Sequence, residues 1–266
     1  MASYLQVENI SKSYGEKILF DKISFNINEG DKIALIAPNG TGKTSLLSIL
    51  AGKDSSDRGG QVKFMKDITI AFLEQDYEFD PHNTIFDEVL RKTEHLYKVV
   101  QEYEEALLSD DKKRLEKAIN AMDSADGWSY DQKIKQILTS LKLPELDKKM
   151  SQLSGGEVKR VAIAGLLLRN ADFLILDEPT NHLDMDIIEF LEDYLKKSRC
   201  TLFMVTHDRY FLDRVCNTIL ELDGGELYTY KGNYSYFLEK REERIANTAA
   251  EVTKARNLLR RELEWI

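Results

Sequence analysis

The chain has 266 residues, 42% of them hydrophobic, and this length allows one or two domains with a buried core. Its net charge of −9 argues against a general nucleic-acid binder, so any contact with RNA or DNA requires a local basic surface. No run of about 18 apolar residues is present and the first residues do not resemble a signal peptide, so we expect no membrane span and a cytoplasmic protein. Cys200 and Cys216 stand in apolar stretches without metal-ligand spacing, and we expect buried, reduced thiols.

The first 75 residues predict short strands around one helix. Residues 32–36 (KIALI) and 68–73 (ITIAFL) are apolar runs typical of buried strands. Residues 43–50 continue from a glycine-rich loop with the apolar spacing of a helix.

Residues 84–123 are rich in charge, and their apolar residues recur at helical intervals. The run Ser109–Asp111 offers a turn and a helix N-cap, and Asp126-Gly127 ends the pattern. We interpret 84–123 as two antiparallel helices, whose apolar positions include Leu107. Residues 88–123 are expected to project with few contacts to the sheet; the alternative is an ordinary helical subdomain packed flat on the core.

The second half alternates between helices and strands. A helix is predicted over 157–169, and a second helix over 185–197 separates buried strands at 173–176 and 201–205. Such strand–helix–strand alternation favours a parallel sheet.

The last part of the chain predicts a hairpin and then one long helix. Strands at 219–222 and 227–230 flank the turn sequence DGGE. From about residue 234 the chain is helical and charged, and it reaches Ile266 without a cap. We interpret it as a helix cut in mid-course, so Leu258, Leu259 and Trp265 should lack a packing partner within the monomer.

The segment from Ala37 to Thr44 (APNGTGKT) follows a strand and opens a helix, which is the context of a phosphate-binding P-loop. Backbone N–H groups and the helix N-terminus would cradle phosphate oxygens, Lys43 would contact the β- and γ-phosphates, and the Thr44 hydroxyl would bind Mg²⁺. The strict pattern has Gly where Ala37 stands. We expect Ala37 at negative φ, because only the later glycines need positive φ.

Two carboxylates end the apolar strand at 173–176. Asp177 can hold Mg²⁺ directly or through water, and Glu178 can orient and polarise the attacking water. An Asp-Glu pair alone is weak evidence, but it is strong downstream of a P-loop.

The ordered set of motifs resembles the ATP-binding-cassette (ABC) family over about residues 3–230. Leu153–Glu157 (LSGGE) matches the family's signature motif, Gln75 ends a strand as the Q-loop does, and the run from Asn181 to Asp184 resembles the D-loop. His207 follows an apolar strand like the switch histidine, and Tyr14 lies where the adenine-stacking aromatic is expected. The resemblance implies an α/β P-loop NTPase fold, an ABC-type nucleotide-binding domain with an antiparallel β subdomain, a helical subdomain and an inserted helical arm.

The same resemblance implies the site residues and an ATPase that uses ATP and Mg²⁺. The catalytic residues are Glu178, His207 and Gln75, and the metal ligands are Thr44, Gln75 and Asp177. The nucleotide-binding residues are Tyr14, Asn39, Gly40, Thr41, Gly42, Lys43, Thr44, Ser45, Ser154, Gly155, Gly156 and Asp184.

The signature segment lies at the start of a helix, which is an anion-binding end. The resemblance implies that it binds the γ-phosphate of a different domain's ATP. Since the chain holds one copy of each motif, a complete site needs a second cassette, either in the same full-length chain or in a homodimer of this fragment.

Within the family, residues 178–184 (EPTNHLD) resemble the ABC-F class of twin-cassette proteins, with the short arm most like the Uup-type branch. Residues 1–233 would be the cassette, 84–123 its arm, and 234–266 the truncated start of the interdomain linker. The class acts on the ribosome, so ribosomal RNA and tRNA are the expected partners, with no membrane.

Charge supports an RNA contact only weakly. Residues 91–117 hold seven basic and seven acidic side chains, and residues 231–266 hold eight and six, so a solvated charged helix explains them as well. Two other functions stay open: the nucleotide-binding subunit of an ABC transporter, and a DNA-associated repair ATPase.

Overall fold

The structure is a computed structural model that describes residues 2–74, 77–90, 94–125 and 127–263, except for the side chains of residues 90, 94–97, 131 and 257–263. The chain divides into two compact units. The first combines Asn28–Gly30 and Phe64–Val205 with the residues before Gln6, and the second combines Gln6–Ile27, Asp31–Lys63 and the chain from Thr206 onward.

The first unit contains the parallel strands β5 (Ile70–Leu73), β6 (Phe173–Asp177) and β7 (Thr201–Val205), in the order β5-β6-β7. Its helices are α2 (Ile85–Leu90), α3 (Glu94–Leu108), α4 (Lys112–Ser124), α5 (Gly127–Ser140), the 3-10 helix η1 (Met150–Gln152), α6 (Gly155–Leu168) and α7 (Met185–Lys197).

Every residue of β6 and β7 is buried, which explains why these strands are continuous apolar runs in the sequence instead of alternating ones. Their register pairs Phe173 with Thr201 and Asp177 with Val205, so the parallel arrangement predicted from the strand–helix–strand pattern is confirmed. Both strands therefore end at the same edge of the sheet.

The second unit contains most of a sheet of order β2-β1-β4, formed by β2 (Lys17–Asn28), β1 (Ser3–Tyr14) and β4 (Gln61–Phe64). It also contains β3 (Lys32–Ile36), β8 (Thr218–Asp223) and β9 (Glu226–Lys231), in the order β3-β8-β9. Its helices are α1 (Lys43–Leu50), α8 (Arg209–Val215) and α9 (Tyr234–Leu263). The predicted short strands near the N-terminus are wrong in length, because β1 and β2 each extend over 12 residues.

The prediction of two helices over residues 84–123 is wrong in number, because α2 precedes α3 and α4 there. Ile85 and Val89 of α2 are buried, and α2 packs against α6 where Gly165 leaves room: a Cβ on Gly165 would lie 3.2 Å from the Val89 carbonyl oxygen. Since α2 is part of the packed helical layer, the hairpin consists of α3 and α4 alone.

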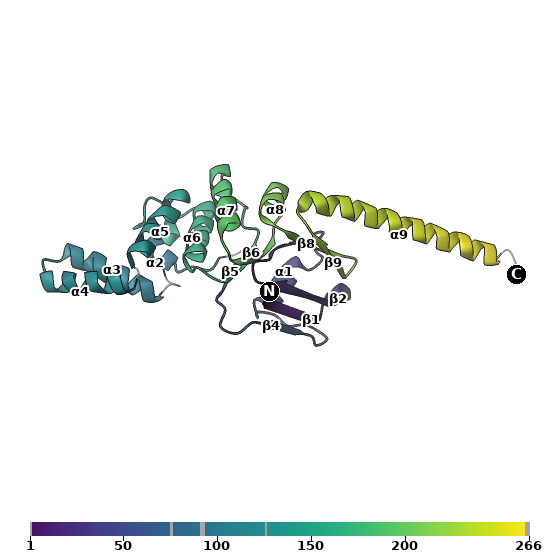
Figure 1. Ribbon diagram of the computed structural model, residues 1–266, viewed down its shortest axis with the longest axis horizontal. Helices are drawn as coiled ribbons and strands as arrows, with labels where there is room; N and C mark the ends of the chain where they lie inside the picture. Colours follow the sequence, from purple (N-terminus) through teal and green to yellow (C-terminus); the bar gives the residue numbers. More distant parts are fainter. Residues whose placement is uncertain (1, 75–76, 91–93, 126, 264–266) are drawn as a thin grey trace. The chain divides into compact units, whose positions relative to one another are not determined.

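The α3–α4 hairpin packs chiefly against itself and α5, away from the strands of its unit (Figure 1). Asp111 caps α4 by accepting hydrogen bonds from two backbone N–H groups, as the turn sequence predicted. The apolar stripe differs from the prediction, because Ala106 is buried and Leu107 is exposed.

Helix α9 is attached only at its start among the described residues. Phe237 is buried against the Tyr230 and Tyr234 rings, and the first turns contact α8 and β9. Residues 245–256 are exposed throughout. Figure 1 shows the later turns of α9 extending away from α8 and β9. The predicted exposure of Leu258, Leu259 and Trp265 lies outside the described side chains.

Both cysteines are free thiols; the predicted burial is confirmed for Cys216 and is wrong for Cys200, which is half-buried. Burial raises the pKa of Cys216 to about 12, which keeps this thiol protonated and unreactive at neutral pH.

Candidate functional site

The P-loop lies between β3 and α1 in the second unit. Gly40 and Gly42 adopt positive φ, 72° and 104°, and a Cβ on Gly42 would lie 3.0 Å from Leu19 Cβ. Glycine is therefore required at position 42 for both conformation and space. Ala37 is buried and does not adopt positive φ, as predicted.

Lys43 bends back over the loop. Its Nζ donates to the Ala37 carbonyl oxygen at 2.8 Å and to Asn39 Oδ1 at 3.2 Å, while Lys17 Nζ donates to the Gly40 carbonyl at 2.9 Å. Sequence reasoning missed Lys17, which lies 23 residues before Gly40. Two ammonium groups and the N-terminus of α1 thus converge on one glycine-rich turn, a favourable environment for an anion.

The other predicted residues of the second unit lie near the ends of strands. Tyr14 ends β1 with 84% of its surface exposed, so it is not a core tyrosine and its ring is available for stacking. His207 is exposed two residues after the end of β7, beside Asp208, the N-cap of α8. Asn39 and Thr44 are exposed too, and Thr41 and Ser45 are partly exposed.

In the first unit, Asp177 ends β6 and Glu178 follows it; both are buried, with Glu178 only 7% exposed. Glu178 adopts a φ of +46°, in the left-handed region that disfavours a side chain. Its backbone N–H donates to the Val205 carbonyl oxygen at 2.8 Å. Such backbone strain gathers at functional sites, because only a well-fixed surrounding structure keeps it.

The signature segment caps α6. Ser154 is the N-cap: its hydroxyl and backbone N–H both donate to Glu157 Oε2, at 2.7 and 2.8 Å, and the Glu157 N–H approaches the Ser154 oxygen. This is a capping box, and with Lys148 it lowers the pKa of Glu157 to about 2. Ser154 and Gly155 are exposed, while a Cβ on Gly156 would approach the His182 carbonyl to 3.2 Å.

A hollow of about 560 Å³ brings much of this set together within the first unit. Its lining includes Gly155 and Gly156 of the signature, Glu178, and Asn181 and His182 of the D-loop. Asp184, the last D-loop residue, is the exposed N-cap of α7. Tyr77 and Lys159 also line the hollow, and neither was singled out from the sequence.

Gln75, predicted for catalysis and for the metal, lies outside the described residues. The P-loop, Tyr14 and His207 belong to one unit, and Asp177, Glu178, the signature and the D-loop belong to the other. The predicted set is thus divided between the two units.

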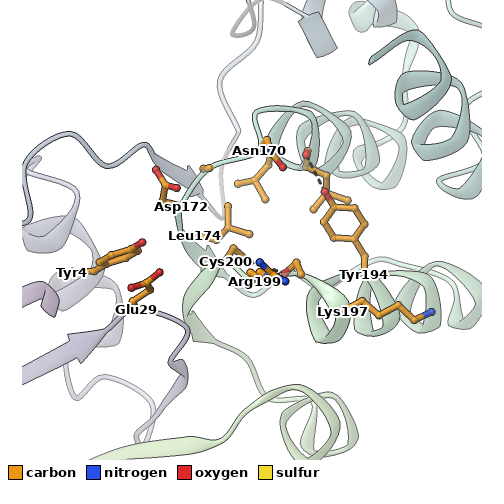
Figure 2. A pocket seen from close by; sticks show the side chains of 13 residues that line it. Tyr4, Glu29, Asn170, Asp172, Leu174, Tyr194, Lys197, Arg199 and Cys200 are labelled. Atoms are coloured by element: carbon orange, nitrogen blue, oxygen red, sulfur yellow. Dashed lines mark hydrogen bonds between the residues drawn. The ribbon is translucent and has the colours of Figure 1, made fainter. Parts of the chain in front are cut away.

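A second hollow of about 510 Å³ lies at the opposite ends of β6 and β7 in the first unit. It is lined by Tyr4, Glu29, Asp172, Tyr194 and Cys200, among others (Figure 2). Asp172 and Cys200 precede their strands, whereas Glu178 follows β6. Because ligands of parallel α/β sheets bind at the carboxyl ends of the strands, the hollow at Glu178 is the functional candidate.

Thr44 in the second unit and Asp177 in the first each offer one oxygen donor of the kind that suits Mg²⁺. Among the described residues, no group of three or more His, Cys, Asp and Glu side chains could hold a metal ion by itself. The Thr44 hydroxyl and the Asp177 carboxylate are hard oxygen donors, and Mg²⁺ characteristically combines one or two such groups with phosphates and water.

Comparison with known proteins decides the family. A family model described as ABC transporter matches residues 20–181, and a second model with the same description matches residues 220–266. The chain belongs to the ABC transporter family. It is an ATP-hydrolysing nucleotide-binding domain with the P-loop NTPase fold.

The similar curated proteins include bacterial cassette proteins. The chain is 46% identical to "Uncharacterized ABC transporter ATP-binding protein YfmR" of Bacillus subtilis, over 99% of this chain and 43% of that protein. It is 35% identical to the "Energy-dependent translational throttle protein EttA" of Mycobacterium tuberculosis over 100% and 49%, and 37% identical to the EttA of Escherichia coli K12 over 93% and 46%. The chain therefore spans less than half the length of these relatives.

Solved structures agree on the fold. An ATP-binding subunit of an ABC transporter superposes with a TM-score of 0.65 at 18% identity, covering 86% of this chain and 90% of that one. A chain in the complex of archaeal ribosomal stalk protein aP1 with the ribosome recycling factor aABCE1 superposes with a TM-score of 0.61 at 25% identity, covering 85% and 39%. The described part of the chain holds no helix long and apolar enough to cross a membrane.

Proposed function

We propose that the chain is the first cassette of an ABC-F protein, which hydrolyses Mg-ATP together with a second cassette and acts on the ribosome in translation. One observation carries the proposal: the similarity to proteins named energy-dependent translational throttle extends over 93–100% of the chain. It therefore includes the α3–α4 hairpin and α9 as well as the nucleotide site.

The proposed chemistry assigns the predicted residues to one ATP. The P-loop N–H groups with Asn39, Lys43 and Ser45 bind the phosphates, and Tyr14 stacks on the adenine. Thr44, Asp177 and Gln75 would hold a Mg²⁺ ion, which would supply charge neutralisation at the phosphates. Glu178 orients and polarises the attacking water, and His207 contacts the γ-phosphate side of the site.

The second cassette completes this arrangement. Ser154, Gly155 and Gly156 at the start of α6 would bind the γ-phosphate of the partner's ATP, with Asp184 beside it. The fragment alone would pair head to tail with a second copy of itself. Residues 1–233 form the cassette in this layout, and α9 starts the linker to the second cassette, in the cytoplasm and without a membrane partner.

The partner on the ribosome would be ribosomal RNA or tRNA, reached by the α3–α4 hairpin and the linker. Because the hairpin and the linker carry both acidic and basic side chains, this contact would depend on shape and on individual side chains more than on general attraction to phosphate. Membership of the Uup-like branch remains a prediction from the short hairpin.

Co-sedimentation with ribosomes tests the function. In the full-length protein, Glu178→Gln combined with the same change in the second cassette should keep ATP binding, stop turnover and trap the factor on ribosomes in ATP. The matched control adds Lys43→Ala together with the same change in the second cassette, which should abolish ATP binding and hence the trapping.

Normal ATP binding without ATP-dependent association would remove the ribosome from the proposal and leave the ATPase intact. Capture of membrane proteins would then favour a transporter subunit, and ATP-dependent binding to branched DNA would favour a repair ATPase.

A further inference from the structure

Lys159 is a buried lysine inside the signature helix. It lies five residues after Ser154, about 1.4 turns along α6, and is only 8% exposed. A buried ammonium group needs oxygen partners, because desolvation of an unpaired charge is strongly unfavourable. Two backbone oxygens are at hand: Lys159 Nζ lies 3.3 Å from the carbonyl oxygen of Asp177 and 3.5 Å from that of Glu74.

The Asp177 carbonyl belongs to the peptide that joins Asp177 to Glu178. The N–H of this same peptide donates to Val205 on β7. Both polar groups of one peptide are therefore engaged, one by the neighbouring strand and the other by the signature helix. This peptide leads directly into Glu178 at φ +46°.

The left-handed conformation of Glu178 is unfavourable for a residue with a Cβ, so it persists only where the surroundings fix it. Rotation of the peptide would turn the Cα–Cβ bond of Glu178 and move its carboxylate within the hollow. A displacement of about 1 Å at a reacting group can lower a rate by about 10²-fold. The contact from Lys159 is thus placed to control the direction of the Glu178 side chain.

We propose that Lys159 is a positioning residue: it holds the Asp177–Glu178 peptide and so aims the Glu178 carboxylate at the attacking water. This inference rests on the proposed role of Glu178 in hydrolysis. Because Lys159 and Ser154 belong to one helix, the aim of Glu178 depends on where the signature end of α6 is held. The contact with Glu74 ties the residue before Gln75 to the same ammonium.

The test variant is Lys159→Met, which keeps the aliphatic stem and removes the ammonium, with Lys159→Arg as the conservative variant. Lys133→Met is the matched control, since Lys133 is also a partly buried lysine whose Nζ contacts a neutral oxygen, Asn170 Oδ1 at 3.3 Å. All variants are made in the full-length protein, with the second cassette's own glutamate changed to Gln so that turnover reports this site.

At saturating ATP, Lys159→Met should lower kcat by about 10- to 100-fold, with the Kd for ATP changed less than threefold. Lys159→Arg should restore most of kcat, and Lys133→Met should resemble the parent. In a Glu178→Gln background, Lys159→Met should have no further effect on the residual rate, because its action passes through Glu178.

Three results would overturn the inference: a kcat for Lys159→Met equal to that of Lys133→Met, a loss of ATP affinity that accounts for the whole defect, or an undiminished effect of Lys159→Met in the Glu178→Gln background. If Lys159→Met does not fold, failure of Lys159→Arg to keep kcat while it binds ATP normally would also overturn it. Failure of the proposed function looks different, since Glu178→Gln itself would then hydrolyse ATP like the parent.

Discussion

Glu178 and Glu221 are two buried glutamates in very different surroundings. Glu178 follows the end of β6, has left-handed backbone and lines a hollow. Glu221 is 3% exposed inside the regular strand β8, where its carboxylate pairs with Arg241 and Arg244 and accepts a hydrogen bond from Tyr230. Arg244 also lies 3.8 Å over the Tyr228 ring.

The difference shows what distinguishes a reactive carboxylate from a structural one. A buried carboxylate surrounded by arginines has its charge matched and its geometry fixed, so it fastens α9 to the β8–β9 hairpin. A carboxylate at a strand end, on a strained backbone and beside open space, can meet a ligand. Burial alone does not separate the two.

The largest expected difference between Glu178→Gln and Glu221→Gln is in the rate of ATP turnover. We expect Glu178→Gln to lower kcat by about 10²- to 10⁴-fold, because the group that polarises water loses its charge. Glu221→Gln should change kcat by less than about threefold, well below that general-base effect. Steady-state hydrolysis measured beside equilibrium ATP binding checks this, and an equal loss in both variants would mean that Glu221 is part of the catalytic machinery.

For protein stability we expect the opposite order, with Glu221→Gln having the larger effect of the two variants. Glu221→Gln weakens charge-assisted hydrogen bonds to two arginines, and we expect a loss of about 1–3 kcal/mol. Amide hydrogen exchange should rise in the first turns of α9, around Phe237. Glu226→Gln is the control, at an exposed position on the same hairpin whose carboxylate accepts a hydrogen bond from Tyr228, and it should change little. Unchanged protection of α9 in Glu221→Gln would contradict the fastening role.

The smallest expected effect concerns Glu157, whose contribution to the stability of the fold should depend on pH. Its pKa is lowered from 4.5 to about 2, chiefly by the Ser154 N–H and hydroxyl and then by Lys148. A lowered folded-state pKa stabilises the fold above the unfolded value, so this contribution is complete above about pH 4.5 and is lost as pH falls to about 2. Because the group is partly exposed, the contribution is about 0.5 kcal/mol or less.

Glu157→Gln should therefore be slightly less stable than the parent at pH 7 and equal to it near pH 2. Denaturant midpoints of the two proteins across this range measure the difference. A gap that stays constant with pH would show that the carboxylate charge contributes nothing to the cap.

Much of the nucleotide site could be predicted because its residues lie in short, continuous segments of the sequence. The P-loop, the Asp177-Glu178 pair and the signature each lie within eight residues, so their chemistry and spacing are visible in the sequence. The roles of Lys159, Lys17 and Glu221 were not predicted. The carbonyl partners of the two lysines and the arginine partners of Glu221 lie at least 18 residues away, so no local pattern indicates them.

The extent of the α3–α4 hairpin also could not be predicted from local sequence patterns. Helical spacing predicted apolar stripes over 84–123. It could not show that α2 packs on α6 whereas α3 and α4 lie away from the core. The α2–α6 contact depends on the space that Gly165 leaves, and Gly165 is distant from α2 in the sequence. Leu107 fits the helical period yet is exposed, with Ala106 buried in its place.

The sequence by itself determined the strand–loop–helix motifs, the buried parallel strands and the family chemistry, because each follows from local periodicity and from side chains a few residues apart. Tertiary structure alone decided the left-handed backbone of Glu178, the lysine that holds its peptide, and the arginines that fasten α9. Those features arise where elements distant in the chain meet, and the free energy of burying a charge is settled only by what lies beside it in space.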